Sequence, residues 1–457
     1  MKQYIIFTIV VLSIQLVSCT KNISPVDADS ADKIDESISY TVPFETALNS
    51  LDIFMREQGL ISDTKGSINH LIDNYFIVKN SLTKSIGTQT DLLYAVNFVD
   101  EGGYALLSAD SRIGEDILAV VEKGTVHEND FVLSDYNLTP TENDDLSTDS
   151  YEDMVESGVL AMTEINTQIN HLCLSYAQHE VGDYFSGGSV SNSGNGSVSE
   201  NTSNPVTYQW QIEEQVPRML TTAWTQEGKN QLFNKYCPEV GLIWRRKAPA
   251  GCVCIAVSQI IAHHEFPASL SCNDMTIDYS AIKDIYCYRD INGTGTAASQ
   301  EMLARFIINV GGWCNTQYHS IFGYSWGFAW PWNARDCLSL FGYENASLNW
   351  SYNENQVINA LNDGCPVFMS AISGVISGHA WVIDGYIKRK YVSSTGSVLN
   401  NQTLVHCNWG WHGDCNGYFT SGVFKSQQAV ITDGFGQYQN ENYWYAFNTV
   451  TYDNPNK

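Results

Sequence analysis

The sequence has few basic residues. Its 457 residues include 24 Lys and Arg against 50 Asp and Glu, which gives a formal net charge of -26. Proteins bind nucleic acids through clusters of Lys and Arg that neutralise phosphates, so this composition argues against a nucleic-acid partner. Only 16% of the residues are charged, while 44% are hydrophobic and 12% aromatic. That hydrophobic content is sufficient for packed cores and excludes disorder over the whole chain.

Long apolar segments are also lacking. Beyond the N-terminus, no run of about 20 apolar residues occurs, which is the length that a membrane-spanning helix needs. No repeat at the periods of solenoid proteins is evident either. The apolar run 5–14 follows Met1 and Lys2 and is too short to span a bilayer, so it predicts an export signal.

The export signal ends in a short motif that contains a cysteine. Leu16-Val17-Ser18-Cys19 resembles the lipobox of bacterial lipoproteins. It predicts a signal peptide over residues 1–18 and a lipidated Cys19, whose acyl chains would anchor the protein in the cell envelope or at the cell surface. An ordinary cleaved signal peptide followed by a chance cysteine is the alternative. A lipidated protein could still release its mature domain into the extracellular medium.

A change in composition divides the rest of the chain. Residues 186–204 are nearly all Ser, Gly and Asn, a composition that cannot form a core and is typical of a flexible linker. We therefore expect a tether and a small domain over residues 19–185, a linker over 186–204 and one large domain over 205–457.

The smaller predicted domain mixes helix and strand patterns. Apolar residues recur at helical spacing from Phe44, and again over residues 155–179. Residues 92–98 and 104–108 are apolar runs on either side of a Gly-Gly turn, which predicts two neighbouring strands. This region is therefore predicted to be a small α+β unit.

The sequence contains twelve cysteines, some of which could form disulfides. If the protein is exported, disulfides can form, but sequence spacing does not reveal their connectivity. Cys407 and Cys415 flank a Gly-rich turn and could bridge it, or both could be small buried thiols.

One cysteine stands where a thiol is easily ionised. The segment 247–264 has a Pro and Gly turn that leads into an apolar helix, and Cys252 lies in its first turn. Free N–H groups and the dipole at a helix start favour the thiolate, as does a nearby imidazolium. Cys252 is thus a candidate nucleophile. Cys254 lies two residues further, about 200° around the helix, and is predicted to face the packed interior.

A candidate base lies far downstream. His379 follows a Gly at the start of an apolar strand, and the next predicted strand, 404–411, ends with Asn408 and Trp409. If the strands are antiparallel neighbours, either Asn408 or Trp409 can lie beside the imidazole. Asn408 would hold it by a hydrogen bond, and Trp409 would shield that bond from water. Side chains alternate between faces, so only one of the two is expected to point at His379.

Three motifs together resemble the streptopain family of papain-like bacterial cysteine peptidases. They are Gly251-Cys252 opening a helix, Gly-His-Ala-x-Val-Ile-Asp-Gly at 378–385, and Asn-Trp-Gly-Trp at 408–411 followed by Gly-Tyr-Phe at 417–419. The resemblance implies an α+β fold, with a papain-like domain made of a helical half and an antiparallel sheet half. It also implies a cysteine-type endopeptidase that acts on proteins or peptides and needs no cofactor.

The resemblance extends to two further regions. Trp224-Thr225-Gln226 looks like the family's Gln-bearing segment, which implies that Gln226 helps to stabilise the oxyanion together with the Cys252 N–H. Residues 94–98 and 103–113 look like the family's propeptide, a separate α+β domain that inhibits the enzyme within the same chain. Cys254 departs from the family pattern, which has a small residue there.

A zinc site, a different papain-like enzyme and a non-catalytic surface protein are the alternative functions. Cys252, Cys254, His263 and His264 could be offered as zinc ligands, but their spacing does not match common structural zinc sites. For the two histidines, stabilisation of the helix C-terminus is expected. A papain-like amidase or transferase would use the same nucleophile chemistry. A non-catalytic surface lipoprotein would have no need of Cys252, His379 and Gln226 together.

Overall fold

The computed structural model describes residues 39–61, 68–80, 90–131, 169–181, 208–241, 245–321, 324–373, 377–424 and 446–457. Of these, Tyr40–Lys457 belong to one compact unit. We call the described residues up to 181 the N-terminal part and those from 208 onward the C-terminal part. The predicted signal peptide, Cys19 and linker 186–204 lie outside the described residues. In the described part of the chain, no helix is long and apolar enough to cross a membrane.

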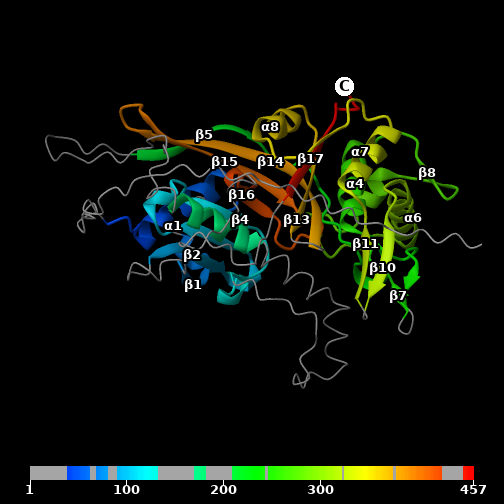
Figure 1. Ribbon diagram of the computed structural model, residues 1–457, viewed down its shortest axis with the longest axis horizontal. Helices are drawn as coiled ribbons and strands as arrows, with labels where there is room; N and C mark the ends of the chain where they lie inside the picture. Colours follow the sequence, from blue (N-terminus) through cyan, green and yellow to red (C-terminus); the bar gives the residue numbers. More distant parts are fainter. Residues whose placement is uncertain are drawn as a thin grey trace, which may run out of the picture. The chain divides into compact units, whose positions relative to one another are not determined.

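One large sheet runs through both parts of the chain (Figure 1). Its strands follow one another in the order β1-β2-β3-β4-β16-β15-β14-β13-β17-β12, and β5 also pairs with β14. The N-terminal part contributes four of them: β1 (Ile72–Lys79), β2 (Asp91–Phe98), β3 (Tyr104–Ser108) and β4 (Ile117–Val121). The C-terminal part contributes the others: β5 (Tyr208–Val216), β12 (Ser347–Asn349), β13 (Val367–Ser373), β14 (Ser377–Ser393), β15 (Val398–Asn408), β16 (Gly417–Thr420) and β17 (Ala446–Thr451).

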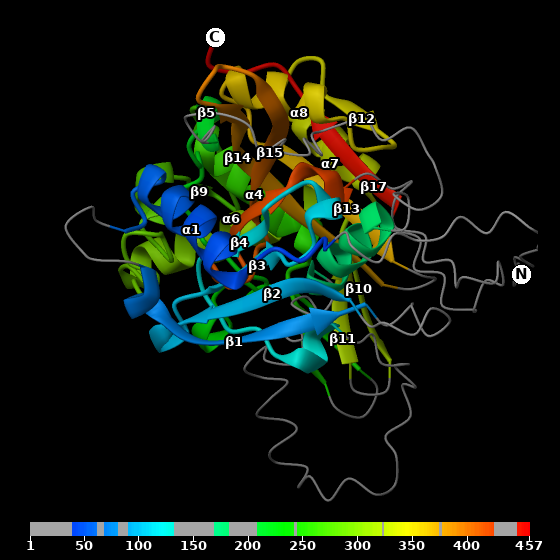
Figure 2. The ribbon, with the colours of Figure 1, turned by 90° about the vertical axis from the view of Figure 1, so that its left-hand side faces the viewer.

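The N-terminal part agrees with its predicted elements. Helix α1 (Phe44–Glu57) buries its apolar stripe, and β2 and β3 pair as an antiparallel hairpin around the turn at Gly103. Residues 169–181 are helical, which agrees with the end of the helix predicted over 155–179, whose earlier residues lie outside the described ones. In Figure 2, α1 packs beside the blue and cyan strands. The last strand, β4, pairs with β16 of the C-terminal part in antiparallel register.

The helices of the C-terminal part gather around α4 (Cys252–His264). Eleven of its thirteen residues are buried, which explains the nearly uniform apolar sequence of this helix. It packs on β13 and β14 on one side and on α6 and α7 on another (Figure 1). The remaining helices are α5 (Tyr279–Lys283), α6 (Ala297–Trp313), α7 (Pro331–Leu340) and α8 (Glu354–Asn362). Three short hairpins complete this part: β6 (Glu239–Val240) with β7 (Arg246–Lys247), β8 (Ser271–Cys272) with β9 (Met275–Thr276), and β10 (Gln317–Ile321) with β11 (Tyr324–Phe328).

The fold is thus α+β, as predicted, with helices on one side of the C-terminal part and an antiparallel sheet on the other. All eleven described cysteines are free thiols. Cys407 and Cys415 are both buried, which favours the second of the two alternatives left open for them.

Candidate active site

The candidate nucleophile lies at the start of α4. Gly251 precedes it with φ +94°, and a Cβ there would lie 3.0 Å from the Gly327 carbonyl oxygen of β11. A residue with a side chain would be strained at this φ and crowded by the backbone, so the sharp entry into the helix requires glycine. Cys252, the first residue of α4, is half-buried.

The two cysteines of α4 face different surroundings. Cys254 is 1% exposed, and its Sγ donates a hydrogen bond to the Ile307 carbonyl oxygen of α6 at 3.3 Å. Burial raises the pKa of the Cys254 thiol well above its usual value. Cys254 therefore belongs to the core between α4 and α6, as the helical periodicity predicts.

Cys252 contacts the strand that carries the candidate base. The backbone N–H of Ala380 in β14 is close enough to the Cys252 thiol to lower its pKa. Burial raises the pKa of this thiol above its usual value, and the Ala380 N–H lowers it only in part. The position of Cys252 at the helix start predicts an easily ionised thiol, whereas the intact chain holds the thiol protonated, because burial outweighs the favourable dipole of the helix start.

His379 lies next to Ala380 and is surrounded by indole rings. Its ring stacks with those of Trp381, Trp409 and Trp411, at centroid distances of 6.1, 6.3 and 5.6 Å. Burial lowers the pKa of His379 to about 4, so the imidazole is neutral at pH 7 in the intact chain. Its strand, β14, is 17 residues long rather than the short strand expected from the sequence.

Two groups compete for the same nitrogen of His379. Nε2 lies 2.8 Å from the Trp409 carbonyl oxygen, and the Trp411 indole N–H donates to Nε2 at 3.1 Å. A protonated Nε2 can donate to the carbonyl but cannot accept from the indole. The protonation state of Nε2 therefore decides which of the two bonds is made.

Asn408 is directed elsewhere. Its side-chain amide donates to the Thr222 carbonyl oxygen at 2.8 Å, and its Oδ1 accepts from Gln259 Nε2 at 3.2 Å. The pairing of β14 with β15 ends at Val382 and Asn408, so Asn408 lies opposite Val382 and not opposite His379. The structure thus brings His379 together with the main chain of Trp409 and the side chain of Trp411, and not with the Asn408 amide.

Gln226 is held near the nucleophile through its backbone. Its carbonyl oxygen accepts from the Ala250 N–H at 3.0 Å, two residues before Cys252, and the residue is 9% exposed. The role of its side chain stays a prediction. Gln259 of α4 was not singled out from the sequence, yet its Oε1 accepts from the Thr222 hydroxyl at 2.9 Å and ties this segment to the helix. The sequence signal for Gln259 was its position as an amide side chain within the apolar run of α4.

The two histidines that end α4 differ from expectation in charge. His264 lies 3.2 Å from the Tyr452 hydroxyl, and burial lowers its pKa to about 3. Burial also lowers the pKa of His263. Both are therefore neutral at pH 7 and support the helix end by packing rather than as cations beside its dipole. Among the residues that the structure describes, no three His, Cys, Asp or Glu side chains are grouped as metal ligands would be.

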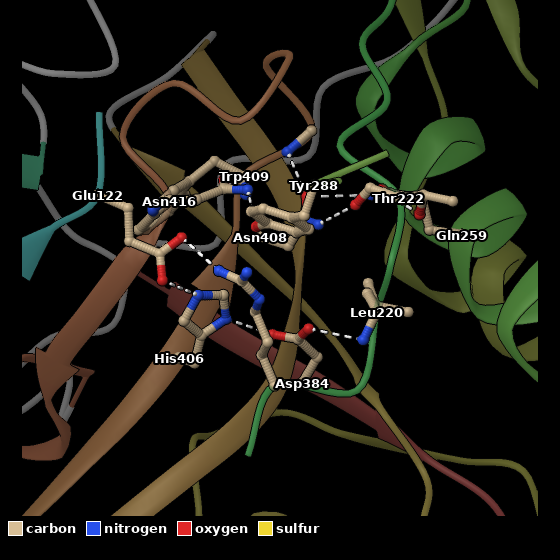
Figure 3. A network of polar contacts seen from close by, with 12 residues as sticks. Glu122, Leu220, Thr222, Gln259, Tyr288, Asp384, His406, Asn408, Trp409 and Asn416 are labelled. Atoms are coloured by element: carbon tan, nitrogen blue, oxygen red, sulfur yellow. Dashed lines mark hydrogen bonds and ion pairs between the residues drawn. The ribbon is translucent and has the colours of Figure 1, made fainter. Parts of the chain in front are cut away.

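A polar network connects the end of β15 to the N-terminal part (Figure 3). The Trp409 N–H donates to the Asn416 side-chain oxygen at 2.8 Å, and the Asn416 carbonyl oxygen accepts from the Glu122 N–H at 2.8 Å. The Glu122 carboxylate accepts from Arg218 at 2.7 Å and lies 3.5 Å from His406 Nε2. His406 Nδ1 in turn lies 2.6 Å from the Asp384 carboxylate. The backbone that holds His379 is therefore linked to a residue just after β4.

Comparison with known proteins agrees with this site. Residues 224–419 match the family model described as the Peptidase C10 family. No curated protein matches the chain. Among solved structures, a mutant fragment of Prevotella intermedia prointerpain A is 20% identical, with 82% of this chain and 98% of that chain covered and a TM-score of 0.46. The active wild-type interpain A cysteine protease of Prevotella intermedia is 23% identical, with 52% of this chain and 95% of that chain covered and a TM-score of 0.37.

The family match begins at Trp224 and ends at Phe419, and so contains Gln226, Cys252 and His379. The match confirms the resemblance drawn from the three sequence motifs. Residues 224–419 are thus similar to the Peptidase C10 family, the streptopain family of cysteine peptidases.

Proposed function

We propose that the chain is the zymogen of an exported, lipid-anchored cysteine endopeptidase, in which the N-terminal part is the inhibitory propeptide. The observation that carries the catalytic proposal is the contact between the Cys252 thiol and the Ala380 N–H, next to His379. This contact places the start of α4 against the strand of the candidate base. The predicted signal peptide and lipobox cysteine, Cys19, carry the proposal of export and anchoring.

The proposed reaction uses five groups of the chain. The Cys252 sulfur attacks the scissile carbonyl carbon, and His379 takes the thiol proton and returns it to the leaving amine. The Gln226 side chain and the Cys252 N–H donate to the oxyanion of the tetrahedral intermediate. Water then hydrolyses the thioester and restores the thiol. The carbonyl of Trp409 is available to stabilise the imidazolium through its Nε2–H.

Both candidate catalytic groups are neutral in the intact chain. Burial raises the pKa of the Cys252 thiol and lowers the pKa of His379 to about 4, so both groups are held neutral. An active thiolate and imidazolium pair would need the opposite shifts. Removal of the N-terminal part is proposed to let the site reach that ionised state.

The maturation of purified protein tests the proposal. The wild-type chain is expected to process itself, with a new N-terminus between residues 186 and 209, and then to hydrolyse a denatured protein substrate. The Cys252→Ala chain should stay unprocessed and inactive, whereas the matched Cys254→Ala chain should behave like the wild type. His379→Ala should cost at least about a thousandfold in kcat/KM, by analogy with other cooperating catalytic groups.

Two results would contradict the proposal. One is a mature N-terminus within residues 44–170 in a protein that keeps its activity, because the inhibitory domain would then be part of the enzyme. The other is normal turnover by His379→Ala. The lipid anchor is tested separately by feeding cells an acyl-chain analogue, which should label the wild-type chain and not Cys19→Ala.

A further inference from the structure

The C-terminal part, which we also call the peptidase region, carries a second polar site on the face where the N-terminal part packs. It consists of Arg218, Tyr288, Asp384 and His406, which come from four separate segments of the chain. Figure 3 labels the last three of these residues. The Arg218 guanidinium lies 3.8 Å from the centre of the Tyr288 ring. Asp384 is fully buried, and besides His406 it accepts from the Leu220 N–H at 2.9 Å. These contacts fix the site independently of the N-terminal part.

The charges of this site call for one more anion. His406 is fully buried with Nδ1 against Asp384; burial lowers its pKa, but the carboxylates of Asp384 and Glu122 outweigh this effect and raise the pKa to about 9. With Arg218 and an imidazolium against a single aspartate, the four residues carry a net charge of +1. His406 Nε2 is buried, and among the described residues it has no hydrogen bond beyond its ion-pair contact with Glu122. A buried N–H donor without a full-strength acceptor is costly, so the site favours a carboxylate at this point.

Glu122 supplies that carboxylate in the intact chain. It directly follows β4, whose residues Ala119, Val120 and Val121 pair with β16. The strands pass so closely that a Cβ on Gly417 would lie 2.2 Å from the Val120 carbonyl oxygen. An extended segment thus adds to the sheet edge at β16, and the residue after it reaches Arg218 and His406 with its side chain.

We propose that Arg218, Tyr288, Asp384 and His406 form a carboxylate-binding site of the peptidase region, which recognises Glu122 and holds the N-terminal part after the chain is cleaved. This inference rests on the proposed zymogen function. The ligand class is an extended, apolar strand that ends in an acidic residue, and the occupant is the chain's own segment from β4 to Glu122. The main chain of Glu122 also binds Asn416, whose side chain holds the Trp409 backbone next to His379.

The site explains how the N-terminal part can stay bound without a covalent link. Strand pairing alone is tolerant of sequence, because backbone groups make the bonds. A carboxylate that must meet the buried His406 and the exposed Arg218 adds selectivity, because a neutral residue at that position leaves both cations without their anion. Recognition is then expected to depend on the charge at position 122 more than on the charge of exposed acidic residues nearby.

The test uses the full chain with Cys252→Ala, cut in the segment 186–204 by an added protease. Dissociation of the two fragments is measured by dilution followed by size-exclusion chromatography. Glu122→Gln is expected to raise the dissociation constant at least about thirtyfold, which corresponds to about 2 kcal/mol at 1.4 kcal/mol per tenfold. Glu128→Gln, on an exposed residue of the same N-terminal part, is the matched control and should change it less than about threefold.

A double-mutant cycle separates recognition from a general loss of folding. If His406 binds the Glu122 carboxylate, His406→Gln and Glu122→Gln should be non-additive, and the double variant should bind about as weakly as the weaker single variant. The circular dichroism spectrum of each uncut chain and the midpoint of its unfolding in urea show whether the variant folds. Fully additive effects, or a Glu122→Gln effect no larger than that of Glu128→Gln, would overturn the carboxylate site.

The outcome is distinguishable from a failure of the proposed function. Fragment binding is read in a chain without the candidate nucleophile, so it does not depend on peptidase activity. Wild-type protein that never hydrolyses a substrate would overturn the proposed function, whatever the fragments do. Active wild-type protein whose fragments separate equally with Glu122 and with Gln at that position would overturn the carboxylate site alone.

Discussion

Replacement of Trp411 by Phe isolates one hydrogen bond to the candidate base. The indole N–H donates to His379 Nε2 at 3.1 Å, while the Trp409 carbonyl oxygen lies 2.8 Å from the same nitrogen. For His379 to accept the thiol proton through Nδ1, its Nε2 must be protonated and must donate to Trp409. The indole of Trp411 therefore stabilises the neutral tautomer that is unable to act as the base through Nδ1.

The expected size of the effect follows from that single bond. An ordinary hydrogen bond contributes about 1 kcal/mol, and one pKa unit corresponds to 1.36 kcal/mol. Trp411→Phe removes a bond that exists only when Nε2 is unprotonated, so the pKa of His379 should rise by about 0.7 from its value of about 4. Phe keeps an aromatic ring against the imidazole, whose centroid lies 5.6 Å from that of Trp411.

Nitrogen NMR of ¹⁵N-histidine-labelled protein measures both the tautomer and the pKa. The intact Cys252→Ala chain is used, with His379→Ala to assign the signal. Trp411→Phe should shift the neutral ring toward the form protonated at Nε2 and raise the pKa, whereas Trp350→Phe, at a residue 67% exposed, should do neither. An unchanged tautomer, or a pKa that falls in Trp411→Phe, would refute the reasoning.

Three further predictions concern stability in urea. Cys254→Ala should lose about 1 kcal/mol through a small packing defect and keep its activity; loss of activity at unchanged stability would contradict the assignment of this thiol to the core. The raised pKa of His406, about 9, means that its contribution is complete below the unfolded value near 6.5 and is lost as the pH rises through about 9. The free energy of unfolding should therefore fall by about 3 kcal/mol between pH 7 and 10. A fall of equal size in His406→Gln would argue against His406 as its cause. Gly385→Ala should cost about 1–3 kcal/mol because its Cβ would lie 2.9 Å from the Arg218 backbone nitrogen, whereas the control Gly312→Ala, with open space around it, should cost less than about 0.5 kcal/mol; equal effects would show that the close approach is unimportant.

Local patterns were sufficient for the elements that build the site. The helix that starts at Cys252, the inward direction of Cys254 and the hairpin of β2 and β3 follow from residue spacing and turn residues alone. These features depend on neighbours within a few residues, where periodicity and glycine conformations act directly.

The surroundings of His379 could not be obtained in the same way. Antiparallel pairing between the strands of His379 and Asn408 was expected, but the register that places Asn408 opposite Val382 is set by the β14 and β15 pairing over many residues. A shift by one residue reverses every side chain, and nothing in the local sequence fixes that choice. The Asn408 amide consequently meets Thr222 and Gln259 instead of the imidazole.

The ionisation of the site was also beyond the sequence. The helix start favours a Cys252 thiolate, but burial in the intact chain raises the pKa of the thiol and lowers that of His379. Burial is a property of the assembled molecule, to which the N-terminal part contributes a sheet continuous with that of the peptidase region. The contact of Glu122 with His406 joins residues 284 positions apart in sequence and has no local signature.

The most direct test of the central claim is to identify the residue that an irreversible cysteine-peptidase probe modifies. The mature protein is labelled, digested and mapped by mass, and fragmentation of the peptide that contains Cys252 and Cys254 distinguishes the two thiols. We expect modification of Cys252 alone, with labelling and hydrolysis both lost in Cys252→Ala and both kept in Cys254→Ala. Modification of Cys254, together with continued turnover by Cys252→Ala, would contradict this expectation.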